Sequence, residues 1–120
     1  MIKSYKDLVV YKLSYDIAMG VFFLTKKFPK EEIYSLTSQI IRSSRSISAN
    51  IAEGWAKREY TNVFKQHLIH SFGSCSESQN WLSFAKDCNY ISEKEFLDLS
   101  NQFDIISKML TKLHQNWKKL

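Results

Sequence analysis

The sequence predicts an all-α protein, a bundle of four antiparallel helices in up-down-up-down order. Apolar and small residues recur at intervals of three and four through residues 33–55, as one face of a helix requires. Proline occurs once and glycine three times, which suits long helices with short connections, and no segment alternates as a strand does. The 120 residues suffice for one core, so we expect a single domain, residues 1–120.

The first helix is expected at about residues 5–28, between a capping box formed by Ser4 and Asp7 and the helix breaker Pro29. It carries two apolar stripes on nearly opposite sides: Leu8, Tyr11, Tyr15, Ala18 and Phe22, and then Val10, Leu13, Ile17, Val21, Leu24 and Phe28. A helix in a lone bundle needs one stripe. We therefore assign Val10, Leu13, Ile17, Val21 and Leu24 to an interface between copies; a bundle that buries this helix more deeply is the alternative.

The second helix is expected at about residues 33–56, with a buried series at positions 33, 36, 40, 44, 47, 51 and 55. Serine and alanine fill many of its other positions, which favours close neighbours on several sides. Gly54 is either a C-cap or a point of close approach. Polar residues in this crowded setting are expected to form a buried network that fixes helix register and subunit geometry: Gln39, Arg42, Asn50, Glu53 and, from the third helix, Glu77.

The third and fourth helices are expected at about residues 61–89 and 92–118. The third has a core series of Phe64, Leu68, Phe72, Cys75, Gln79 and Leu82. Gly73 within it costs about 1 kcal/mol relative to alanine, so we expect tight helix packing there. Ser92 and Glu95 form a second capping box. The fourth helix then repeats an unbroken apolar seam: Phe96, Leu99, Phe103, Ile106, Leu110, Leu113 and Trp117.

Three segments together carry a family resemblance: FPKEE, SLTSQIIRSSRSISANIAEG and GSCSES. With them, nearly the whole chain resembles the four-helix-bundle proteins encoded by intervening sequences of bacterial 23S ribosomal RNA. The accessory variability proteins of diversity-generating retroelements are similar. The resemblance implies a homopentamer with a basic surface, partners among nucleic acids or reverse transcriptases, and no enzymatic activity attached to the shared motif.

The charge balance favours a polyanionic partner. Seventeen basic and twelve acidic residues give a net charge of +5. The basic residues expected to contact a phosphate backbone fall into two groups: Lys26, Lys27 and Lys30, and then Arg45, Lys57, Arg58 and Lys65. A solvated charged face is the alternative for a single copy. A homopentamer would repeat each group around a ring, which favours backbone binding without sequence readout.

The sequence lacks the motifs that are typical of other functional classes. No Glu-x-x-His pair, zinc spacing, phosphate loop or nucleophile elbow occurs, so we expect no metal, no cofactor and no enzymatic activity. His67 and His70 share a helix with Cys75, but Cys75 falls away from the side of His67. Without a signal peptide, a long apolar run or a disulfide framework around Cys75 and Cys88, the expectation is a cytoplasmic protein without membrane contact.

The sequence predicts a non-catalytic, basic, homo-oligomeric protein that binds RNA or DNA, and the resemblance implies that it acts as an accessory to a nucleic-acid enzyme such as a reverse transcriptase. The alternative is a structural or protein-interaction scaffold with no role in nucleic-acid binding.

Overall fold

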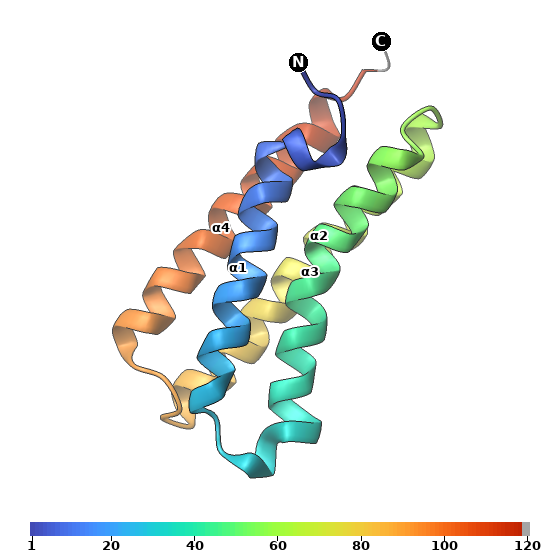
Figure 1. Cartoon of the computed structure of the whole chain (residues 1–120). Helices are drawn as coiled ribbons and strands as arrows, with labels where there is room; N and C mark the ends of the chain where they lie inside the picture. Colours follow the sequence, from blue (N-terminus) through green and yellow to red (C-terminus); the bar gives the residue numbers. More distant parts are fainter. Residues whose placement is uncertain (119–120) are drawn as a thin grey trace.

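The computed structural model describes residues 1–118, which form four α-helices and no strand. The helices are α1 (Val9–Leu24), α2 (Ser38–Ala56), α3 (Thr61–Asp87) and α4 (Glu93–Asn116). They lie side by side in an elongated bundle of 48 × 25 × 21 Å (Figure 1). α3 packs against α2 and α4, and α1 completes the bundle by packing against the same two helices. The expectation of an all-α fold is confirmed.

The first predicted helix is interrupted at Leu8. The capping box of Ser4 and Asp7 is present, but it caps only a single 3₁₀ turn, η1 (Tyr5–Asp7). Leu8 then adopts an extended conformation, which buries its side chain, and α1 begins at Val9 without a side-chain cap. The helix therefore starts four residues later than the capping signal indicated, because burial of Leu8 redirects the chain.

Three short turns join α1 to α2. They are the 3₁₀ turns η2 (Thr25–Lys27) and η3 (Lys30–Glu32), and the π-helical turn η4 (Ile33–Thr37). The Glu32 carboxylate caps η4 by accepting a hydrogen bond from the Leu36 amide. Regular α2 thus begins at Ser38 rather than near Ile33, and Ile33 itself is exposed.

A left-handed residue and a capping box form the turn between α3 and α4. Asn89 has φ 63°, a conformation common just beyond a helix C-terminus, and its amide donates to the Lys86 carbonyl. Ser92 and Glu95 form the predicted capping box at the start of α4. α4 contributes Phe103, Ile106 and Leu110 to the core, where all three are almost fully buried.

Small residues bring α2 and α3 together. The hydroxyls of Ser43 and Ser78 are 2.8 Å apart, and the Ser71 hydroxyl donates to the Ile47 carbonyl across the two helices at 2.9 Å. At Gly54, a Cβ atom would stand 2.7 Å from the Cβ of His67. Of the two roles open to Gly54 on the sequence, the structure supports close approach.

Two expectations about packing are wrong. Phe72 is 41% exposed, and Ser71 occupies the core beside it. Gly73 faces open space, because a Cβ atom added there would meet no atom of a neighbouring element within 4 Å. A helical periodicity fixes the spacing of a buried series but leaves its phase open by one residue, and the close α2–α3 packing selects the smaller Ser71.

The predicted interface stripe of α1 lies in the core of a single chain. Val10, Ile17, Val21 and Leu24 are at most 9% exposed, so the assignment of these four to contacts between copies is corrected. Leu13 is 37% exposed. The apolar residues that α1 leaves on the surface are Val9, Leu13, Tyr15, Met19 and Phe23. The first stripe is largely covered as well, because Leu8 and Ala18 are buried and Tyr11 and Phe22 are half-buried. The apolar face that α1 leaves exposed therefore coincides with neither predicted stripe.

Alanine substitutions at two glycines should have opposite effects on stability. Gly54→Ala forces a methyl group against His67 and Phe64, so the free energy of unfolding should fall by about 1–3 kcal/mol. Gly73→Ala meets no neighbouring element and should raise it by up to about 1 kcal/mol, through lower backbone entropy in the unfolded state. Urea titrations of both variants test this; equal effects would contradict the close approach at Gly54.

Candidate nucleic-acid interface

Two of the predicted basic residues meet at one aromatic ring. Lys26 follows α1 in η2, and Arg45 projects from α2. The Lys26 Nζ lies 4.3 Å, and the Arg45 guanidinium carbon 5.6 Å, from the centre of the Phe22 ring. Both cations are exposed, and the ring is half-buried. Phe22, Lys26 and Arg45 form what we call the Phe22 cluster, in which attraction to the ring holds two cations in place.

Lys27 and Lys30, the other members of the first predicted basic group, differ in whether their charge is already paired with a carboxylate. The Lys27 Nζ donates to both carboxylate oxygens of Glu95 at 2.7 Å, and this hydrogen bond lowers the pKa of Glu95. The charge of Lys27 is thus largely compensated within the chain. Lys30, in the following turn η3, is exposed.

The four residues of the second predicted basic group do not form one cluster. Arg45 lies on α2, and Lys57 stands twelve positions later, directly after the last residue of this helix, a separation of about 18 Å at the helical rise. Lys57 makes a 2.7 Å ion pair with Glu53, and Lys65 is half-buried on α3. The Arg58 guanidinium lies 4.4 Å from the centre of a Trp55 ring and donates to the Trp55 carbonyl. Arg45 therefore belongs with Lys26, and this part of the prediction is corrected.

The predicted buried polar network is not buried. Arg42, Glu53 and Glu77 are exposed, while Gln39 and Asn50 are half-buried. The Glu77 carboxylate accepts a hydrogen bond from the indole of Trp81, one turn further along its own helix. The α2–α3 contact is crowded, so the charged side chains of Arg42, Glu53 and Glu77 point toward solvent, because burying a charge is costly.

Serines take the buried polar positions instead. Ser43, Ser44, Ser71 and Ser78 are at most 4% exposed. Their hydroxyls donate to backbone carbonyls of α2 or α3, so they need no charged partner. The sequence contained a signal for one of them, since Ser44 lies in the predicted buried series of α2.

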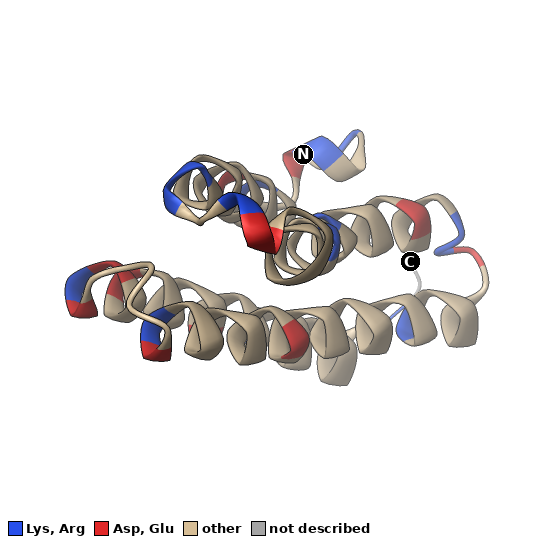
Figure 2. Ribbon diagram, turned by 90° about the horizontal axis from the view of Figure 1, so that it is seen from below, with Lys and Arg blue, Asp and Glu red and all other residues tan. Residues whose placement is uncertain are grey.

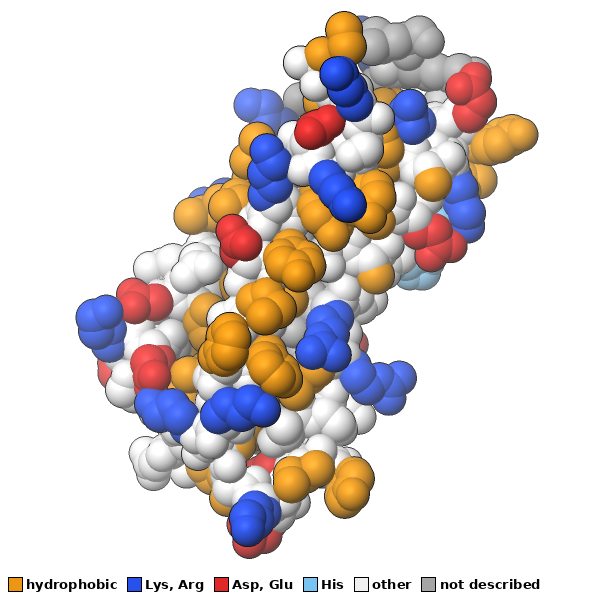
Figure 3. Space-filling view, viewed as in Figure 1, with side chains coloured by type: hydrophobic (Ala, Val, Ile, Leu, Met, Phe, Trp, Pro, Cys, Tyr) orange, Lys and Arg blue, Asp and Glu red, His pale blue; other side chains and the backbone are white. Residues whose placement is uncertain are grey.

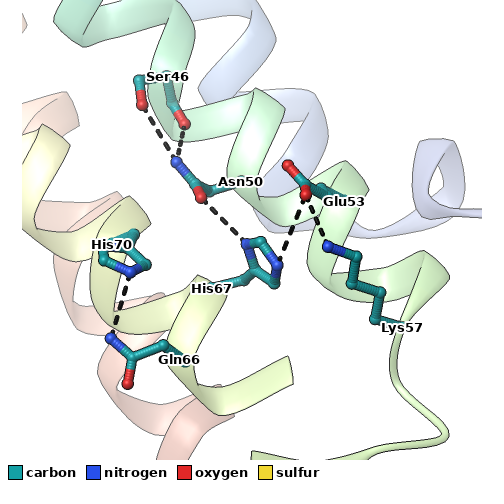
Figure 4. Close-up of polar contacts among 7 residues, drawn as sticks. All are labelled: Ser46, Asn50, Glu53, Lys57, Gln66, His67 and His70. Atoms are coloured by element: carbon teal, nitrogen blue, oxygen red, sulfur yellow. Dashed lines mark hydrogen bonds and ion pairs between the residues drawn. The ribbon is translucent and has the colours of Figure 1, made fainter. Parts of the chain in front are cut away.

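A chain of polar contacts joins α2 to α3 beside these buried serines (Figure 4). The Asn50 amide donates to the carbonyl and hydroxyl of Ser46, so its oxygen faces the Nδ1 of His67 at 3.1 Å. That oxygen only accepts, so the Nδ1 of His67 is the donor in this contact. The His67 Nε2 lies 3.8 Å from Glu53. The hydrogen bond and charge of Lys57, with the nearby His67, lower the pKa of Glu53.

The histidines and cysteines do not converge on a metal site. No group of three or more potential ligands that could hold a metal ion occurs among residues 1–118. Cys75 is buried, and burial raises the pKa of its thiol to about 11, so it stays protonated at neutral pH. The His70 ring instead lies 3.2 Å from the Gln66 amide on its own helix.

Positive and negative residues are interspersed over the helix ends and turns (Figure 2). Lys26 and Arg45 are two cations that stand together, at the Phe22 ring. No helix among the described residues is long and apolar enough to cross a membrane.

Comparison with known families decides the relationship that the three sequence segments suggested. The family model described as 23S rRNA-intervening sequence protein matches residues 6–112. The chain belongs to this family. Among solved structures, it is similar to a protein of unknown function from the S23 ribosomal protein family of Bacteroides thetaiotaomicron. The two share 26% sequence identity with a TM-score of 0.82, over 90% of this chain and 96% of the other. A comparison with curated proteins gives no match.

Proposed function

We propose that this 23S rRNA-intervening sequence protein is a non-catalytic, homo-oligomeric accessory protein that binds RNA or DNA through the phosphate backbone. In this proposal the bundle has up-down-up-down order, five copies assemble, and the particle acts in the cytoplasm alongside a nucleic-acid enzyme such as a reverse transcriptase. Membership of a family named for ribosomal RNA intervening sequences supports a nucleic-acid setting.

The Phe22 cluster is the observation that carries the proposal. Lys26 and Arg45 come from different elements, yet both are exposed and both contact one ring. Among residues 1–118 their recorded contacts are with Phe22 and not with a carboxylate, so their charge is available to phosphate oxygens. Lysine supplies a point charge and arginine a planar fork, and both bind phosphate. Contacts to phosphate oxygens carry no information about the bases, so binding through them is expected to be independent of sequence.

Assembly would multiply this modest charge. Five copies at +5 each carry a net charge of about +25, with the Phe22 cluster repeated in each. The exposed apolar residues of α1 are the proposed contact surface between copies. Figure 3 shows apolar side chains gathered in a strip along α1, with Lys and Arg side chains beside it. An apolar strip with a charged border is typical of a protein interface.

A protein-interaction scaffold is the second candidate, and the apolar side chains of α3 favour it. Ile69 and Phe72 are 50% and 41% exposed, and they line a groove shared with Leu110 of α4. In a scaffold the positive charge would serve only solubility. Salt separates the two functions, because phosphate contacts weaken steeply with added salt whereas apolar docking does not.

Reversing the two cations of the Phe22 cluster should weaken nucleic-acid binding. Lys26→Glu with Arg45→Glu should reduce affinity for single-stranded RNA by about tenfold or more at low salt, and the dependence of affinity on salt should become shallower. The matched control is Lys6→Glu with Lys94→Glu, which changes the net charge equally at exposed sites elsewhere. Fluorescence anisotropy measures both. Equal losses in the two variants would contradict a localised contact.

Charges on the two sides of α1 should have different consequences. Val9→Glu with Phe23→Glu alters residues that are 60% and 62% exposed, so helicity should persist while the mass falls toward that of one chain. Ile17→Glu places a charge in a site 1% exposed and should cost several kcal/mol of stability. Circular dichroism and light scattering provide the readouts. An unchanged assembly in the double variant would exclude this face of α1 as the interface.

A further inference from the structure

A pocket of about 400 Å³ lies where α2 begins and α3 ends. Its volume is within the range of small-ligand sites. η4 and the start of α2 form one wall, with Tyr34 and Gln39, and the last turns of α3 form the other, with Trp81 and Phe84. The Glu32 carboxylate also lines it. None of these residues belongs to the Phe22 cluster.

Three aromatic rings border this pocket; two of them are exposed and the third, Trp81, is half-buried. Tyr34 is 95% exposed and Phe84 is 53% exposed. Phe84 follows Trp81 by one helical turn, and their ring centres are 5.9 Å apart at 39°. The Trp81 indole N–H is already donated to Glu77, so the ring offers its π face rather than a hydrogen-bond donor to a ligand. Aromatic faces attract cations.

The Glu32 carboxylate supplies a fixed negative charge beside these rings. Its Oε1 accepts hydrogen bonds from the Ser35 hydroxyl at 2.6 Å and the Leu36 amide at 3.3 Å, and its Oε2 accepts from the Tyr90 hydroxyl at 2.8 Å. The bonds from Ser35 and Tyr90 lower the pKa of Glu32, so it is ionised at neutral pH.

These contacts also determine which cation fits. A carboxylate offers about four acceptor positions, two on each oxygen. Both positions on Oε1 are occupied, and one remains on Oε2. The paired hydrogen bonds of a guanidinium fork need one position on each oxygen, whereas a compact ammonium needs only one. Nucleic acid is disfavoured here, because its phosphates would face the ionised Glu32 carboxylate.

We propose that this pocket binds an alkylammonium head group, presented by a lysine side chain on a partner protein. The head would rest against the faces of Tyr34, Trp81 and Phe84 and donate to the Oε2 of Glu32. The Gln39 amide oxygen, on the same pocket wall, is a further acceptor. The methylene stem of the lysine would cover the exposed ring of Phe84, as long charged side chains do on apolar surfaces.

The indole N–H resonance of Trp81 reports on this site. It is one of three tryptophan signals, identified by its loss in Trp81→Phe. Titration of ¹⁵N-labelled protein with the peptide acetyl-Gly-Ser-Lys-Ser-Gly-amide should shift it saturably. The same peptide with arginine in place of lysine should bind more weakly, and the norleucine peptide, which keeps the stem and lacks the charge, at least about fivefold more weakly.

Two variants and one control complete the test. Phe84→Ala and Glu32→Gln should each weaken the lysine peptide about threefold to tenfold. Tyr60→Ala, which removes an exposed aromatic ring at the opposite end of α3 and outside the pocket, should leave the affinity unchanged. Circular dichroism checks that each variant folds, and if Glu32→Gln unfolds, Phe84→Ala alone decides. No saturable shift with lysine, equal binding of norleucine, or equal losses in Phe84→Ala and Tyr60→Ala would overturn the proposal.

Discussion

The close contact between α2 and α3 is the constraint on which the rest of the structure depends. Ser43 meets Ser78, Ser71 reaches the backbone of α2, and Gly54 leaves space for His67 and Phe64. Each of these positions requires a small residue, because the backbones approach too closely for a long side chain. The long polar side chains of α2 are therefore found on sides of the helix away from this close contact. Arg45 reaches Phe22 from one of these sides, so the packing of α2 helps to create the Phe22 cluster.

Much of the secondary structure could be predicted from local sequence signals. Caps and periodicity depend on residues three or four positions apart, so Ser92 and Glu95 indicated the start of α4, and its seam lies in the core from Phe103 to Leu110. The break at Leu8 could not be found in this way, because its cause is burial against other helices. The same limit applied to α1, because only its packing on α2 and α4 decides which of its apolar residues are buried.

The candidate site depended still more on tertiary structure. Lys26 and Arg45 were both recognised as basic residues of interest, but proximity along the chain placed them in different groups. Their meeting at Phe22 follows from the packing of α1 on α2. Similarly, Glu53 was expected in a buried network and instead joins an exposed chain of contacts with Lys57 and His67. Charge and periodicity identified candidates, and helix pairing decided which of them act together.

The surface therefore offers contrasting chemistry at separate places. The Phe22 cluster presents two cations, the pocket beside Glu32 presents aromatic rings and a carboxylate, and α1 presents an apolar strip. An accessory protein that holds a nucleic acid and a protein together would need this separation, because a single charged face would attract only one kind of partner.

The mass of the purified protein in solution, alone and with a mixed RNA ladder, tests this account most directly. Light scattering at low and moderate salt should give a particle of about 70 kDa, five times the 14.1 kDa chain, that gains mass from RNA only at low salt. A mass of one chain would contradict the assembly. A stable assembly whose mass does not rise with RNA at either salt concentration would contradict nucleic-acid binding and favour the scaffold.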